Sequence, residues 1–164
     1  MKKLLCILLL LLILSLTACQ KEPPTVQDSF DLAFTVTQDE TDYAGTLNLG
    51  DGIMKITMTA PYTIEGMAFT YENGELTIGC GSLGTKANCD YLPAESIPTS
   101  LYDALTYLAQ AVYTESQDGS DSFSLPTPYG DAVLTAENGL PTSLQIPQSD
   151  LSFHFQPISE KGSS

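Results

Sequence analysis

The residues best suited to chemistry in this sequence are two cysteines and one histidine. Cys80 and Cys89 lie nine residues apart, and His154 is the only histidine among the 164 residues. Two thiols and one imidazole fall short of the four ligands typical of zinc, so no metal site and no cofactor is predicted. His154 alternates with Phe153 and Phe155, which turns it away from the core and favours a solvated side chain. A Ser-His-Asp arrangement stays open, because its members need not be neighbours in sequence. No Gly-x-Ser-x-Gly motif supports one, however, and no catalytic residue is predicted.

The N-terminus has the pattern of an export signal. Lys2 and Lys3 precede an apolar run over residues 4–16, and residues 16–19 read Leu-Thr-Ala-Cys. The run is shorter than the roughly 20 residues that a membrane-spanning helix needs. Residues 16–19 resemble the lipobox of bacterial lipoproteins. That resemblance implies that residues 1–18 are cleaved off and that the Cys19 thiol receives a diacylglycerol. We therefore expect a lipid anchor on the extracytoplasmic face of the cell membrane. An uncleaved anchor and cleavage without lipidation are the alternatives.

Cys80 and Cys89 form an even pair in a chain that is expected to be exported, where disulfides persist. Gly79, Gly81 and Gly84 would let the chain close a loop between them. An unstrained bond would contribute about 2–3 kcal/mol. The sequence therefore favours a Cys80–Cys89 disulfide, with two free thiols as the alternative.

The charge balance of the sequence is strongly acidic. Removal of Lys2 and Lys3 with the signal would leave four of the six basic residues against all 20 acidic ones, a net charge of −16. Such a surface repels nucleic acid, which is bound through Lys and Arg, and it also repels anionic lipid head groups. No nucleic-acid partner is predicted, and attachment to the membrane would have to come from the lipid. Solubility is the simplest role for the acidity.

The chain divides into a signal (1–18), a polar, proline-containing tether (19–28), one domain (29–158) and a short tail (159–164) that we expect to be disordered. Apolar residues alternate with polar ones through five segments of the first half of the domain, with turn residues between them, which predicts antiparallel strands. Residues 79–95 are rich in glycine and are expected to be irregular. Four further strands are predicted within residues 122–155.

One helix is expected between the two groups of strands. Leu101, Leu105, Leu108 and Val112 have helical spacing, which predicts an amphipathic helix over residues 100–113 with Ser100 or Thr99 as its cap. A sheet with one apolar face needs a cover, and this helix is the only one available. The expected fold is therefore α+β: a curved antiparallel half-barrel of about eight to nine strands packed around one main helix.

This architecture resembles the LolA/LolB-like lipoprotein carriers, which are half-barrels closed by a helical lid. The matching segments are Ala-Pro-Tyr at 60–62, Ile-Glu-Gly-Met-Ala-Phe at 64–69, Asn-Gly at 73–74 and Glu-Asn-Gly-Leu-Pro at 137–141. The resemblance implies an apolar cup that carries a lipid or a lipidated protein. The chain departs from the family because it has no Arg, no Trp and a single helix.

Phe34, Met58, Phe69 and Leu105 are the candidate lining of such a cup. Three functions follow from the sequence. The first is a membrane-anchored protein that binds an apolar ligand between sheet and helix. The second is a non-catalytic surface module with a filled core that contacts another protein, and the third is an enzyme of unknown type. A cavity of about 300–1,000 Å³ at the four residues would favour the first, and a packed interface would favour the second.

Overall fold

The structure is a computed structural model that describes residues 23–128 and 130–158. The signal, Cys19 and the tail at 159–164, with the predictions made for them, lie outside these residues. No helix within the described residues is long and apolar enough to cross a membrane.

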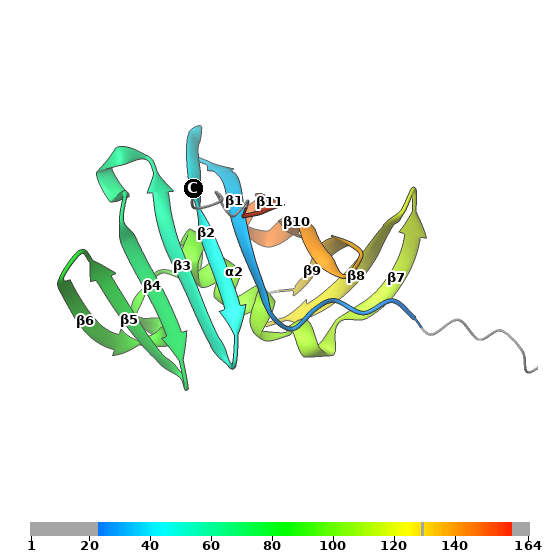
Figure 1. The fold of residues 1–164 in the computed structure, drawn as a ribbon, viewed down its shortest axis with the longest axis horizontal. Helices are drawn as coiled ribbons and strands as arrows, with labels where there is room; N and C mark the ends of the chain where they lie inside the picture. The colour runs from blue at the N-terminus through cyan, green and yellow to red at the C-terminus, as the bar shows by residue number, and fades with distance from the viewer. Residues whose placement is uncertain (1–22, 129, 159–164) are drawn as a thin grey trace, which may run out of the picture.

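The described chain forms one antiparallel sheet of 11 strands with a single α-helix across it (Figure 1). Six strands precede the helix: β1 (Phe30–Gln38), β2 (Thr41–Gly50), β3 (Ile53–Ala60), β4 (Met67–Glu72), β5 (Glu75–Cys80) and β6 (Leu83–Asn88). The helix is α2 (Ile97–Thr106). Five strands follow it: β7 (Val112–Gln117), β8 (Ser120–Thr127), β9 (Gly130–Glu137), β10 (Leu140–Ile146) and β11 (Leu151–Pro157).

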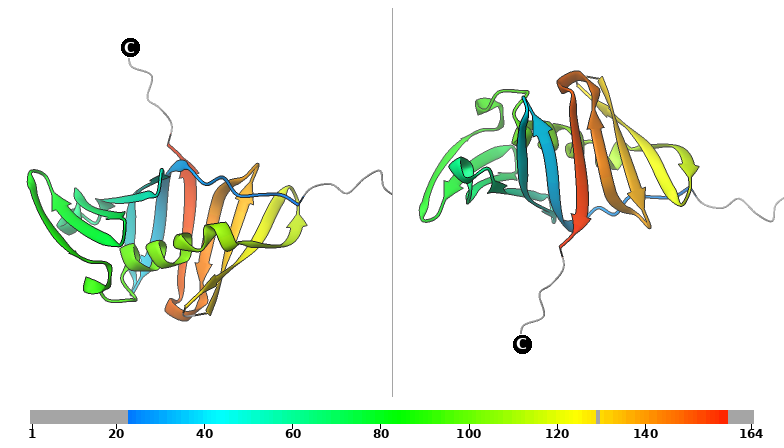
Figure 2. Two further views of the ribbon diagram at one scale, coloured as in Figure 1. Left: turned by 90° about the horizontal axis from the view of Figure 1, so that it is seen from below. Right: turned by 90° about the horizontal axis from the view of Figure 1, so that it is seen from above.

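The strands are ordered β6-β5-β4-β3-β2-β1-β11-β10-β9-β8-β7, so the first and last strands of the chain meet in the middle. The outer strands β6 and β7 each have one neighbour, which leaves the described sheet open. The sheet curves, and α2 lies across its strands on the concave side (Figure 2). The predicted architecture is confirmed in outline, with more strands than the eight to nine expected.

Alternation and tight turns build the first half as predicted. In β1, Phe30, Leu32, Phe34 and Val36 are buried, while outward residues such as Thr35 are exposed. Asn73 and Gly74 both have positive φ angles, as a tight hairpin turn between β4 and β5 requires.

Two segments differ from the sequence prediction. Residues 79–95 contain β6, and residues 112–117, placed partly in the helix and partly in a loop, form β7. Val112 is 60% exposed, so its helical spacing from Leu108 was coincidental. Both strands lie at the sheet edges, where pairing with a single neighbour orders the chain without burial of an apolar face.

The helix is shorter than predicted and starts earlier. It begins at Ile97 with Ser96 as its N-cap residue, so Ser100 and Thr99 are not the cap. Pro98 occupies the first turn, where its missing N–H is tolerated. The helix ends at Thr106, and a short 3₁₀ turn, Leu108–Gln110, leads into β7.

Candidate functional site

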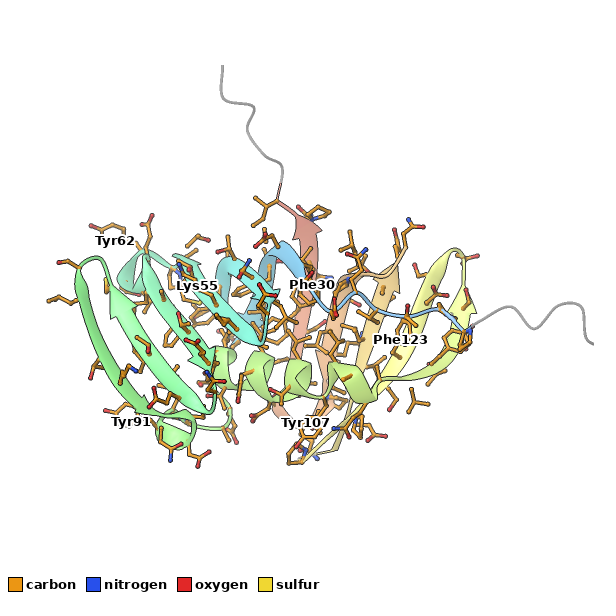
Figure 3. The ribbon with its side chains drawn as sticks, turned by 60° about the horizontal axis from the view of Figure 1, so that its bottom comes forward. Phe30, Lys55, Tyr62, Tyr91, Tyr107 and Phe123 are labelled. Carbon is orange, nitrogen blue, oxygen red and sulfur yellow. The ribbon has the colours of Figure 1, made fainter. Side chains whose placement is uncertain are left out.

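The middle of the concave face is filled by α2. Leu101 is fully buried and Leu105 is 3% exposed, and both belong to one apolar core with the inward residues of the sheet. Figure 3 shows the helix lying across the strands, with Tyr62 and Tyr91 at the periphery of the half that contains β3–β6. A single central cup is therefore absent from the described structure, and the apolar spaces lie beside the helix.

Phe34 belongs to this filled centre and lines none of these spaces. Its ring covers Gly45 on the paired strand β2 and meets Phe153 edge-on, with 6.0 Å between ring centroids. The Phe34 ring instead occupies the volume that a side chain at position 45 would take.

Met58 and Phe69 line a cavity of about 280 Å³ beside the start of α2. The other apolar walls come from β2, the 3₁₀ turn Tyr62–Ile64, β4 and the helix: Tyr43, Ile64, Met67, Ile97 and Pro98. The only polar side chains at this cavity are Gln38 and Ser96, apart from the Tyr43 hydroxyl.

A second cavity, also of about 280 Å³, lies on the sheet-edge side of the first. Met67 lines both cavities, and Ile78, Cys80 and Leu83 extend the lining across β5 and β6. Leu83 is 79% exposed. We call these two cavities together the Met67 groove; their lining extends from the helix N-terminus to edge strand β6.

Leu105, the fourth candidate, lines a separate cavity of about 350 Å³ beside the C-terminal half of α2. This cavity is at the other end of β3, near Met54, and the N-terminal segment closes one side of it with Val26 and Asp28. The Gln27 N–H donates to the Gly139 carbonyl at 2.8 Å and fixes this segment on the sheet. The four predicted residues thus do not surround one site.

The contact between α2 and β4 contains a buried hydroxyl without a hydrogen-bond partner. Tyr71 is 1% exposed and stacks on Tyr102 of the helix with 4.1 Å between ring centroids. Burial raises the pKa of Tyr71 to about 12, and the neighbouring Thr99 side chain opposes part of the rise. Burial, followed by the charge of Asp90, also raises the pKa of Asp103 on the same helix.

The structure contradicts the predicted disulfide. Cys80 pairs with Leu83 at the turn of the β5–β6 hairpin, whereas Cys89 follows Asn88 at its opposite end, and both thiols are free. Five residues of strand separate the two positions, or about 16 Å, and a disulfide requires Cα atoms within about 7 Å. The glycine-rich segment forms a hairpin, and that hairpin holds the cysteines apart.

His154 is exposed on the convex face, as the alternation predicted. Within the described residues, no hydrogen bond joins it to a serine or a carboxylate, and no three His, Cys, Asp or Glu side chains gather to hold a metal ion. The arrangement offers binding surfaces, with no assembled catalytic group around His154.

Sequence reasoning missed most of the Met67 groove. Met67, Ile78 and Leu83 line it, and the last of these lies in a strand that was expected to be irregular. The alternation of Leu76 and Ile78 was visible in the sequence, but its continuation across the turn was hidden because β6 buries almost nothing.

No protein-family model matches the chain, and no curated protein matches it. Solved structures with a similar layout include a LolA superfamily protein from Nitrosomonas europaea, with 13% identity, a TM-score of 0.46 and coverage of 79% of this chain and 84% of that one. An uncharacterized conserved protein from Thermus thermophilus has 9% identity, a TM-score of 0.45 and coverage of 79% of each chain. The structure of the CwlD amidase in complex with the GerS lipoprotein from Clostridioides difficile matches at 14% identity and a TM-score of 0.40, over 73% of this chain and 76% of that one. At these identities and scores, the likeness concerns layout and establishes neither a family nor a function.

Proposed function

We propose that this chain is a lipid-anchored, extracytoplasmic protein without catalytic activity that binds an acyl chain in the Met67 groove. The observation that carries the binding function is that two mainly apolar cavities, each of about 280 Å³, share Met67 in their lining. A ligand that filled both cavities would occupy a volume within the range of small-molecule sites. The lipobox-like residues 16–19 support the anchor and the location.

The chemistry of the groove suits a flexible hydrocarbon. Met58 and Met67 have unbranched thioether side chains that adapt to irregular apolar shapes. Each buried methylene of an acyl chain contributes about 0.8 kcal/mol. A lipid and a lipidated protein would both supply this chemistry, and the exposed end of the groove at Leu83 leaves room for a head group or an attached protein.

The test is binding of N-phenyl-1-naphthylamine, an uncharged apolar probe, to the full chain and to Met67→Gln. Loss of part of a half-buried Met surface is worth about 1 kcal/mol, so we expect roughly fivefold weaker binding. Val133→Gln is the matched control, because Val133 is an apolar residue exposed on the opposite face of the sheet. Mass spectrometry of lipid extracted with the purified chain then separates free lipid from acylated protein.

Equal probe affinity in the Met67 and Val133 variants would contradict the groove assignment. Absence of any bound probe, together with absence of co-extracted acyl chains, would contradict the binding function as a whole. The anchor has its own test, because Cys19→Ser should abolish lipid attachment and release the protein from membranes. A Cys19→Ser chain that loses its signal and remains membrane-bound would contradict the anchor.

The alternative, a surface module that contacts another protein, is favoured by the filled centre of the sheet. Leu101 and Ala104 leave no central cavity, and β6 and β7 each present an unpaired edge. Cross-linking in cells that recovers a protein at either edge, with no acyl chain in the groove, would favour this function over the first.

A further inference from the structure

The first and last strands of the sheet, β1 and β11, pair along only part of their length. β1 pairs with β2 over nine positions, from Phe30 to Gln38, but with β11 over four, and that ladder ends at Thr35 and His154. Both strands continue beyond this point, β1 to Gln38 and β11 back to Leu151, yet residues 36–38 and 151–153 are not paired with each other. Figure 2 shows the two strands meeting at one end and spreading apart towards the other.

A cavity of about 590 Å³ lies at this divergence, which we call the β1–β11 slot. Most of its lining is outward-facing and exposed: Thr35, Thr37, Asp42, Ser152 and His154, with Asp150 at the start of β11. Val36, an inward-facing core residue, also lines it. The slot therefore lies mainly on the convex face and reaches β1 at Val36.

The slot is bordered by the backbone edges of β1 and β11 and by two aspartate side chains. Each edge carries backbone N–H and C=O groups in extended conformation, the template that an added strand uses. Asp42 stands on the β2 side and accepts a hydrogen bond of 2.7 Å from the Thr37 hydroxyl, and Asp150 stands on the β11 side. Neither lysine of the described residues, Lys55 or Lys86, lines the slot.

We propose that the β1–β11 slot binds an extended, basic peptide segment of a partner protein by strand addition. The segment pairs its backbone with residues 36–38 or 151–153, and its lysine or arginine side chains lie near Asp42 and Asp150. Charge complementarity decides the occupant, because the slot offers carboxylates and hydroxyls and the protein has a large acidic excess. This site shares only Tyr43 with the Met67 groove, and the proposal does not rest on acyl-chain binding.

The experiment uses the isotopically labelled full chain in zwitterionic detergent at low ionic strength. The probe is a capped peptide, Lys-Val-Thr-Val-Lys-Thr, and its counterpart has glutamate in place of lysine. We expect amide chemical-shift changes and slower hydrogen exchange at residues 36–38 or 151–153 with the lysine peptide alone. Slower exchange reports new backbone hydrogen bonds, which attraction between charges does not produce.

Asp42→Asn/Asp150→Asn should weaken binding of the lysine peptide by roughly two- to thirtyfold, the range for two exposed ion pairs. Asn suits position 150, where φ is 53°. Asp51→Asn/Asp118→Asn is the matched control, because both residues are turn aspartates with positive φ, neither lines the slot, and the net charge changes equally. We expect the control to bind as the parent does.

Three results would overturn the proposal. The first is unchanged hydrogen exchange at both segments when the peptide is saturating. The second is equal weakening in the two double variants, which would indicate a general effect of net charge. The third is capped lysine or a neutral polyol binding as tightly as the peptide, which would show a point-charge or sugar site instead of strand addition. The probe assay on Met67→Gln reports on the groove separately.

Discussion

Gly45→Ala is expected to destabilise the fold through two identified contacts. A Cβ atom at this position would lie 2.6 Å from Phe34 Cζ and 2.6 Å from the Thr57 carbonyl oxygen. Both distances are about 1 Å shorter than ordinary van der Waals contact. Overpacking of this kind costs about 1–3 kcal/mol, and we expect the upper half of that range because the Thr57 oxygen belongs to the backbone and cannot rotate away.

Gly50→Ala on the same strand is the matched control. The nearest heavy atom to its added Cβ is Ser29 Cβ, at 3.6 Å, which is ordinary contact. Since alanine restricts the unfolded chain more than glycine does, this variant should be unchanged or more stable by up to about 1 kcal/mol. Urea denaturation followed by far-ultraviolet circular dichroism measures both, and with a slope of about 1–3 kcal/mol/M the two midpoints should differ by roughly 1–2 M.

A double-mutant cycle with Phe34→Leu identifies the contact. Shortening the ring removes one of the two clashes, so Gly45→Ala should cost about 1 kcal/mol less in the Phe34→Leu background, while the Thr57 clash keeps it destabilising. Equal stability of the two alanine variants would refute the steric reasoning. Strict additivity of Phe34→Leu and Gly45→Ala would refute the placement of the ring over Gly45, and with it the explanation of why Phe34 lines no cavity.

Two further predictions concern buried and reactive groups. Tyr71→Phe removes a buried hydroxyl without a partner and should stabilise the fold by about 1 kcal/mol. Because the folded-state pKa of about 12 lies above the ordinary value, the fold should lose stability as pH rises from about 10 towards 12. Urea midpoints across that range should show a smaller loss in Tyr71→Phe than in the parent, and identical slopes would contradict the assignment. Cys80 and Cys89 should both react with a maleimide under denaturing, non-reducing conditions, and Cys89→Ser should change stability by far less than the roughly 2–3 kcal/mol of a lost disulfide. Recovery of a linked Cys80–Cys89 peptide would contradict the free thiols.

Local patterns predicted the elements that bury one face. The alternation from Phe30 to Val36 and the Asn73-Gly74 turn correspond to β1 and to the β4–β5 hairpin, because both signals depend on residues adjacent in sequence. The helix was located but misplaced at its ends. Leu101 and Leu105 are buried on α2, whereas Val112 of β7 pairs with Ser124 of β8, a partner 12 positions away in sequence that no helical period reveals.

The candidate site was harder to predict because it depends on the empty volume left between the sheet and the helix. Phe34, Met58, Phe69 and Leu105 are all buried on the concave side, as the alternation and the helical spacing implied. Whether inward-facing residues surround a cavity depends on how closely the helix packs on the sheet and on which aromatic rings fill the space over neighbouring strands. The alternation of apolar and polar residues carries no information on either. Gly45 illustrates the limit, since the space above a glycine in β2 is filled by a residue of β1.

The two proposed sites lie on either side of one hairpin and share one residue. Tyr43 of β2 lines both the β1–β11 slot and the first cavity of the Met67 groove. A Tyr43 substitution would therefore disturb both sites and could not distinguish them. The other lining residues can, because Met67 belongs to the groove alone, whereas Asp42 and Asp150 belong to the slot alone. If an acyl chain in the groove and a peptide in the slot each moved the Tyr43 ring, each ligand would change the affinity of the other by the same factor. Titration of the lysine peptide with and without N-phenyl-1-naphthylamine measures that factor, and a value of one would show that the sites are independent despite their common wall.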